Sequence, residues 1–148
     1  MNRSQTRILA RRSAMQAIYQ WQMTGYNLAE IERQFIEEHG LGYADPAYFN
    51  ELLHEVPKNL DTIDNALSDF TDRPISEIDP VERAVLRIGA YELLHRPELP
   101  FKVILNENIN LAKTFGSIHG HKFVNGILDK VAHKIRAVEI AAYLNKRG

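Results

Sequence analysis

The sequence of 148 residues contains no cysteine, so disulfide bridges and thiolate metal sites are both excluded. It has no apolar run of the roughly 20 residues needed to span a bilayer, and its first residues lack the apolar stretch of a signal peptide. These absences favour a cytoplasmic protein that does not enter the membrane. His-Glu-x-x-His zinc pairs, phosphate-binding glycine loops and the Gly-x-Ser-x-Gly turn of hydrolases are also missing. We therefore expect no metal site, no cofactor and no enzymatic activity.

Acidic residues are absent from the first 29 positions, which hold Arg3, Arg7, Arg11 and Arg12. The first three are spaced by four residues and share one face of a helix, because residues four apart are neighbours there. The same face becomes apolar from about Ala14, so we expect the helix to be packed from that point and its first turns to project beyond the core. A cationic projection indicates an anionic partner, although a frayed basic N-terminus would have the same sequence.

The net charge of −1 conceals a strong separation of charge along the chain. Counting Lys, Arg, Asp and Glu, residues 1–29 carry +4, residues 30–79 carry −10 and residues 80–148 carry +5. We expect the two basic ends to share one electropositive surface while the acidic middle faces elsewhere. Such a surface would bind polyanions despite a sequence pI of about 6.6.

Helical periodicity dominates the chain, and no segment alternates as a half-buried strand would. Gly25 is a plausible helix stop, and Asn27, Asp45-Pro46 and Asp79-Pro80 are helix starts. Pro57 interrupts the third segment, which is either one kinked helix or two helices meeting near Val56. The signals predict helices over about residues 5–24, 28–39, 46–72, 80–95, 102–115 and 120–136, with a short helix or a loose tail over 137–146.

These elements predict an all-α fold, a helical bundle of six to seven helices that forms a single domain over residues 1–148. The break at Arg73-Pro74 suggests two sub-bundles, over about 1–72 and 79–136, that share one core. The helix over 80–95 has a wide apolar surface, so we expect it to be central and mostly buried. Glu92 and Asn108 fall on apolar faces. A buried Glu92 needs a partner or a shifted pKa, and Asn108 needs a hydrogen-bond partner.

Three segments carry motifs that are specific in combination. The first is Ala-Arg-Arg-Ser-Ala-Met-Gln-Ala-Ile-Tyr-Gln at residues 10–20, and the second is Asp-Pro-Val-Glu-Arg-Ala-Val-Leu-Arg at residues 79–87. The third joins Pro-Phe-Lys-Val-Ile-Leu-Asn-Glu at residues 100–107 to Lys-Phe-Val-Asn-Gly-Ile-Leu-Asp at residues 122–129. Together they resemble the NusB family of bacterial transcription antitermination factors, from about residue 10 to residue 132.

The resemblance implies a fold of two three-helix sub-bundles. It also implies binding of boxA, a short single-stranded element of nascent transcripts, chiefly of ribosomal RNA. In the family this occurs together with NusE, which is also a small-subunit ribosomal protein. The pair then joins other Nus factors and RNA polymerase to oppose termination.

Individual residues take roles from the same resemblance. Arg7 and Arg11 match the N-terminal arginine motif of the family, whereas Arg12 stands where a polar residue is common. The resemblance also implies a second RNA-facing element, at the start of the last long helix, and a surface that binds NusE. The RNA-binding candidates are Arg3, Arg7, Arg11, Arg12, Lys122, Phe123 and Asn125, and the partner-binding candidates are Glu82 and Arg83.

The chemistry of these side chains suits single-stranded RNA. Arginines and Lys122 would neutralise phosphates, which makes affinity fall with salt. Phe123 could stack on a base, or pack in the core at a helix start. Asn125 could read a base edge, since it both donates and accepts, or serve as a local cap. We expect a double replacement of Arg7 and Arg11 by Ala to weaken RNA binding and to leave thermal stability nearly unchanged.

Two other functions fit parts of the sequence. A NusB-like module can serve an RNA methyltransferase, but such a module normally precedes a cofactor-binding domain, and none follows here before Gly148. A helical adaptor could instead use the arginine stripe to bind an acidic protein surface. The sequence leaves the oligomeric state open, and a homodimer through a helix face is possible.

Overall fold

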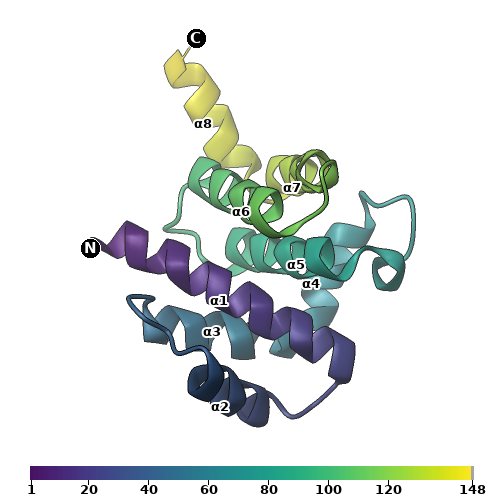
Figure 1. Cartoon of the computed structure of the whole chain (residues 1–148). Helices are drawn as coiled ribbons and strands as arrows, with labels where there is room; N and C mark the ends of the chain where they lie inside the picture. The colour runs from purple at the N-terminus through teal and green to yellow at the C-terminus, as the bar shows by residue number, and fades with distance from the viewer. Residues whose placement is uncertain (148) are drawn as a thin grey trace. The chain divides into compact units, whose positions relative to one another are not determined.

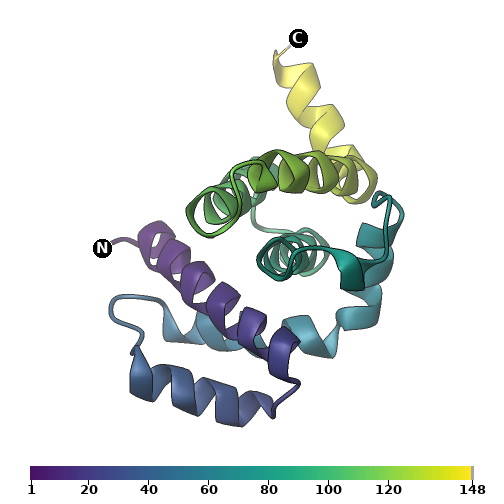
Figure 2. The same ribbon diagram turned by 45° about the vertical axis from the view of Figure 1, so that its right-hand side comes forward.

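A computed structural model describes residues 1–147, and in this range all regular structure is helical (Figures 1 and 2). The predicted all-α class is confirmed. No helix of the described residues is long and apolar enough to cross a membrane. The elements are α1 (Arg3–Thr24), α2 (Leu28–Glu38), α3 (Pro46–Lys58), α4 (Leu60–Ser68), a 3₁₀ helix η1 (Ile75–Glu77), α5 (Pro80–His95), α6 (Phe101–Phe115), α7 (Gly120–Ile135) and α8 (Ala137–Arg147).

Residues 1–147 thus contain eight α-helices, where the sequence predicted six to seven. One difference lies at Pro57, which cannot donate a backbone hydrogen bond, so the segment divides into α3 and α4 around Asn59. The Asn59 side chain amide donates to the Glu55 carbonyl at 2.8 Å and closes the end of α3. The other difference is that the C-terminal segment, left open between helix and tail, forms α8.

Local signals set both ends of α1. The Asn2 side chain accepts from the Gln5 backbone N–H at 2.9 Å, while the Gln5 side chain accepts from the Asn2 N–H at 3.0 Å. This reciprocal capping box satisfies two amides that have no partner within the helix. At the other end Gly25 has φ 68°, a left-handed conformation that glycine adopts without steric cost, and its N–H donates to the Trp21 carbonyl at 2.8 Å. The predicted stop at Gly25 is confirmed.

The helices fall into two compact units, Met1–Leu60 and Asp61–Gly148. In the first unit α1 packs against α3 and α2, and the Asp45 N–H donates to the Thr6 carbonyl at 3.0 Å. Its core includes Ile18 of α1, Ile31 of α2 and Leu52 of α3, all fully buried. Ala10 is fully buried as well, so α1 is packed from one turn before the predicted position at Ala14.

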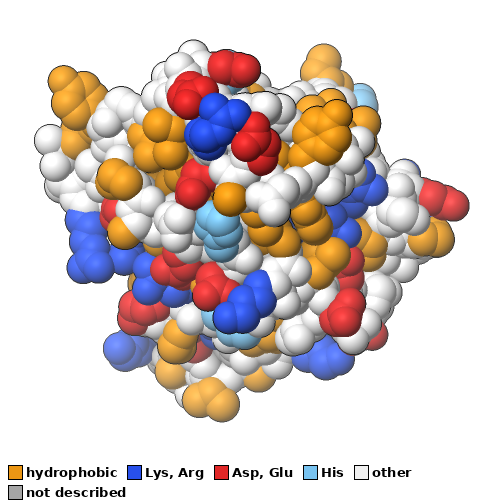
Figure 3. Space-filling model, turned by 90° about the horizontal axis from the view of Figure 1, so that it is seen from below, with side chains coloured by type: hydrophobic (Ala, Val, Ile, Leu, Met, Phe, Trp, Pro, Cys, Tyr) orange, Lys and Arg blue, Asp and Glu red, His pale blue; other side chains and the backbone are white. Residues whose placement is uncertain are grey.

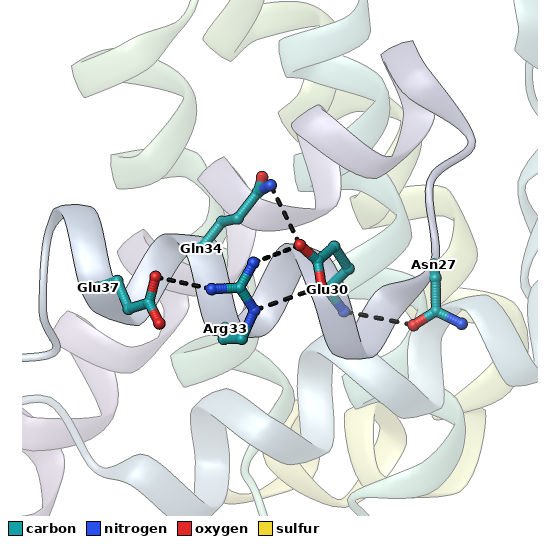
Figure 4. Close-up of polar contacts among 5 residues, drawn as sticks. All are labelled: Asn27, Glu30, Arg33, Gln34 and Glu37. Atoms are coloured by element: carbon teal, nitrogen blue, oxygen red, sulfur yellow. Dashed lines mark hydrogen bonds and ion pairs between the residues drawn. The ribbon is translucent and has the colours of Figure 1, made fainter.

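The outer face of α2 carries a network of opposite charges (Figure 4). The Arg33 guanidinium pairs with Glu30 and donates to Glu37 Oε2 at 2.8 Å, while Asn27 caps the N–H of Glu30. The hydrogen bond from Arg33 lowers the pKa of the Glu30 carboxyl. On the face that the space-filling view shows, acidic and basic side chains also stand next to one another (Figure 3). This mixed, internally paired face contrasts with the unmixed charge of α1.

In the second unit α5, α6 and α7 pack against one another, and α8 packs on α7. The Arg87 guanidinium holds α4 to α5 through two hydrogen bonds to Asp64, at 3.0 and 2.9 Å. α5 is buried over most of its length, as its wide apolar surface predicted. Asn108 of α6 donates to Glu92 Oε1 and to the Ile104 carbonyl, both at 2.9 Å. The predicted need of Asn108 for an internal partner is confirmed.

Candidate nucleic-acid interface

The four arginines of α1 have different environments within the first unit. Arg3 and Arg12 are exposed, Arg7 is half-buried, and Arg11 is only 3% exposed. Within residues 1–147, Arg3, Arg7 and Arg12 form no ion pair with a carboxylate. Their charges are therefore available to an anion, because nothing in the described part of the protein neutralises them.

Tyr48 of α3 lies beneath two of these arginines. The guanidinium carbon of Arg7 is 5.0 Å from the centre of the Tyr48 ring, and that of Arg11 is 5.5 Å from it. A cation near the face of an aromatic ring is attracted by the ring's quadrupole, and the ring also holds the side chain in one position. These two arginines thus pack against α3, whereas the sequence predicted that the first turns of the helix project beyond the core. Sequence reasoning missed Tyr48, because it is distant in the chain and reads as an ordinary core aromatic.

The start of α7 brings together the second group of predicted RNA-binding residues. Lys122 and Asn125 are exposed, and Phe123 is half-buried. The guanidinium of Arg73 lies over the Phe123 ring, 5.0 Å from its centre. Arg73 also faces Asp72, whose Oδ1 is 3.4 Å from the guanidinium Nε. Lys122 forms no ion pair within residues 1–147. A free cation, an aromatic ring with a guanidinium on it and an exposed amide therefore share one corner of the second unit.

Arg73 is a candidate that sequence reasoning also missed. In the sequence it stands out only as part of the Arg73-Pro74 break between helices. No local pattern connects it to Phe123, which lies on a helix much later in the chain. A guanidinium plane is a surface on which an unpaired base can stack, so Arg73 is a candidate alongside the predicted residues of this corner.

Glu82, predicted to bind a partner, lies beneath the start of α7. It is 8% exposed and accepts a hydrogen bond from the Ser117 hydroxyl at 3.2 Å. A Cβ atom on Gly120 would come within 2.1 Å of Glu82 Oε1, so a glycine as the first residue of α7 allows this close approach. The carboxylate is thus placed at the positive end of the α7 dipole. Glu82 supports the turn that presents Lys122.

Arg83, the other partner-binding candidate, is half-buried and turned toward η1. Its Nη1 donates to the Ser76 carbonyl at 3.0 Å, while its buried Nε has no hydrogen-bond partner among residues 1–147. Desolvation lowers the pKa of the guanidinium, and the nearby charge of Arg87 lowers it further. The structure therefore separates the two candidates: Glu82 approaches the start of α7, and Arg83 holds the segment that precedes α5.

In the part of the chain that the structure describes, no three His, Asp or Glu side chains come close enough to hold a metal ion. The two groups present cations, an aromatic ring and an amide. In proteins that bind single strands, such side chains contact phosphates, bases and base edges.

The chain is similar to proteins of one known family. The NusB family matches residues 9–133. A transcription antitermination protein NusB from Nitrosococcus oceani is 53% identical over 144 residues, which cover 97% of this chain and 97% of that protein. Another, from Pseudomonas savastanoi pv. phaseolicola, is 53% identical over 134 residues, which cover 90% of this chain and 81% of that protein.

Solved structures agree with these relatives. NusB of T. maritima superposes with a TM-score of 0.74 at 29% identity, covering 85% of this chain and 89% of that one. A NusB solved with NusE in complex with double-stranded RNA gives a TM-score of 0.74 at 23% identity, covering 88% of this chain and 97% of that one. At that identity the second likeness shows a shared fold alone. Matched by the family over residues 9–133 and 53% identical to a relative along nearly its whole length, the chain belongs to the NusB family.

Proposed function

We propose that this protein acts in transcription antitermination by binding the single-stranded boxA element of nascent RNA, chiefly ribosomal RNA, together with NusE. The observation that carries the proposal is its 53% identity to a transcription antitermination protein along 97% of both chains. The complex would then join other Nus factors and RNA polymerase. The activity is binding and not catalysis, and residues 1–148 act as a single RNA-binding domain in which each compact unit supplies RNA contacts of its own.

In the first unit, we propose that Arg3, Arg7 and Arg12 contact phosphates. Their charges have no carboxylate partner within residues 1–147, so binding costs no internal ion pair. Tyr48 holds the Arg7 guanidinium in place, which lowers the entropy lost when a phosphate binds to it. Arg11, nearly buried on the same ring, adds its charge from beneath and keeps the face of α1 in position.

In the second unit, Lys122 contacts a phosphate and the Arg73–Phe123 pair forms a stacking platform. One base stacked on this platform contributes about 1–3 kcal/mol. Asn125 follows on the next turn of α7, exposed, with both a donor and an acceptor for a base edge. This division assigns affinity to the cations and sequence reading to Phe123 and Asn125.

NusE is proposed to bind near Glu82 and Arg83, at the start of α5. Because Glu82 also supports the start of α7 through Ser117 and Gly120, a protein bound there would steady the turn that carries Lys122. A cationic surface of this size should bind RNA weakly alone. Tight and selective binding would then require NusE.

The test is a fluorescence-anisotropy titration of labelled boxA RNA against a scrambled RNA of equal length, with and without NusE. We expect boxA to bind more tightly than the scramble, and NusE to increase the difference. Replacing Phe123 by Leu should weaken boxA binding by about 1–3 kcal/mol, whereas Phe123→Tyr keeps a stacking ring and should retain most of it. Equal affinity for the two RNAs in the presence of NusE would refute the proposal.

A further inference from the structure

A basic hollow lies where α8 passes the start of α6 in the second unit. It has a volume of about 370 Å³ and is lined by Phe101 and Lys102 of α6 and by Tyr143 and Lys146 of α8. α8 projects from the end of α7 in both ribbon views (Figures 1 and 2). None of the RNA-binding candidates named above lines this hollow.

Two cations contact Tyr143, which is one of the residues that line the hollow. Lys102 donates a hydrogen bond to the phenol oxygen, and its Nζ lies 4.5 Å from the centre of the ring. Arg147 Nη1 donates to the same oxygen at 3.2 Å. The Phe101 ring meets Tyr143 edge-on, with 5.7 Å between the ring centres, and fixes its orientation. The hydrogen bonds from Lys102 and then Arg147 lower the pKa of Tyr143, as a positive environment should.

Within residues 1–147, no carboxylate neutralises the cations of the hollow. Glu139 is its only acidic residue, and both of its oxygens are occupied. Oε1 accepts from Arg136 Nη1 at 2.6 Å, and Oε2 accepts from the Phe101 N–H at 2.8 Å. In the described residues, none of Lys102, Lys146 and Arg147 forms an ion pair with a carboxylate. Lys102 and Arg147 on the Tyr143 ring, and Lys146 in the lining of the hollow, are thus available to an external anion.

We propose that this hollow binds backbone phosphates of the single-stranded RNA that flanks boxA. The inference depends on the function proposed above, because a strand bound at Lys122 continues beyond the element on both sides. From Lys122 to the end of α7 at Ile135 the distance along the helix is about 20 Å, at 1.5 Å per residue, so a short flank spans it. Every nucleotide carries the same phosphate, so a flank that is held by its phosphates is bound whatever its sequence.

The experiment compares boxA RNA alone with boxA RNA carrying an oligouridine tail at its 5′ or its 3′ end, in the presence of NusE. The test variant replaces Lys102, Lys146 and Arg147 by Gln. We expect the wild type to bind one tailed RNA more tightly than boxA alone, by about fourfold for each phosphate contact at 0.15 M salt. The variant should bind boxA alone as the wild type does and lose the gain from the tail.

The matched control replaces three exposed lysines elsewhere, Lys58, Lys113 and Lys130, by Gln, which removes the same charge. It should keep the tail-dependent gain. The inference is overturned if neither tail raises the affinity of the wild type, or if the control loses as much of the gain as the test variant. In both cases boxA would still bind better than its scramble. Loss of that preference would instead refute the proposed function and the flank site together.

Discussion

Two adjacent arginines of α1 illustrate how differently one residue type behaves in two environments. Arg11 is 3% exposed and lies near the Tyr48 ring, whereas the next residue, Arg12, is exposed. Replacing Arg11 by Ala should lower the free energy of unfolding by about 1–3 kcal/mol, because it removes both the packing of the stem and the interaction of the guanidinium with the ring. Replacing Arg12 by Ala should change it by no more than about 0.5 kcal/mol.

Urea unfolding followed by circular dichroism measures both values. Equal stabilities for the two variants would contradict the burial of Arg11.

The result also bears on the expectation, drawn from the sequence, that replacing Arg7 and Arg11 together leaves stability nearly unchanged. Because Arg11 is buried, we instead expect its replacement to lower the stability of the double variant. Loss of RNA binding in the double variant would therefore not identify a direct contact, whereas Arg3→Gln with Arg12→Gln would.

The sequence predicts individual residues well only where their partners are close in the chain. The Asn27 cap on Glu30 and the Gly25 stop each involve residues within one helical turn, and both are found as predicted. The sequence predicted that Asn108 needs a partner, but it did not identify Glu92 as that partner. The Tyr48 ring beneath the arginines could not be predicted, because it depends on how α3 packs on α1. The same holds for Arg73 on Phe123.

At the scale of helices, Arg136 joins the end of α7 to the end of α5. Its guanidinium donates to the carbonyls of Leu93 and Leu99 at 2.9 Å and to that of Arg96 at 2.9 Å. These carbonyls lie at or beyond the last turn of α5, where no helical amide can reach them. Replacement of Arg136 by Lys should destabilise the protein by about 3 kcal/mol, nearly as much as replacement by Ala, because an ammonium cannot reproduce the planar fork. An unfolding temperature clearly higher for the Lys variant than for the Ala variant would contradict this role.

The junction of α5 and α7 makes a second prediction at this scale. Gly120→Ala places a methyl group against Glu82 and should cost about 1–3 kcal/mol. Gly126→Ala is the matched control, since a methyl group there meets no atom within 4 Å, and it should stabilise α7 by about 0.4–1 kcal/mol. Combining Gly120→Ala with Glu82→Ala removes the clash, so the two losses should not add. Additive losses in denaturant unfolding would show that Glu82 and Gly120 do not meet.

Helix boundaries were predictable to the extent that they depend on local chemistry. The Asp45-Pro46 and Asp79-Pro80 starts are found where the sequence placed them, since an aspartate cap and a first-turn proline act within one turn. Pro57 left two alternatives, and the choice between a kink and two helices depends on packing at Val56, which is fully buried. The contacts divide the chain between Leu60 and Asp61, earlier than Arg73-Pro74, so most of α4 belongs to the second unit.

On the scale of the whole molecule, the separation of charge along the sequence has a structural counterpart. The acidic middle of the chain includes α2, whose Glu30 and Glu37 are paired with Arg33, and Asp64, which is paired with Arg87. The basic ends keep cations that no carboxylate of residues 1–147 neutralises, among them Arg3, Arg12 and Lys122. A protein of net charge −1 can thus attract RNA, because many of its acidic residues are paired internally while these basic ones are not.

This arrangement makes a quantitative prediction for the salt dependence of boxA binding. If each unit contacts the RNA, Arg3→Gln with Arg12→Gln should lower the slope of log K against log salt by about 0.7 for each phosphate that the arginines no longer neutralise. Lys122→Gln should lower it by about 0.7, and the combined variant by the sum, because the affected phosphates differ. Titrations at several potassium chloride concentrations, with NusE present, give the slopes. A slope that only one set of replacements changes would mean that a single unit holds the RNA, and the assignment of contacts to the other would then fall.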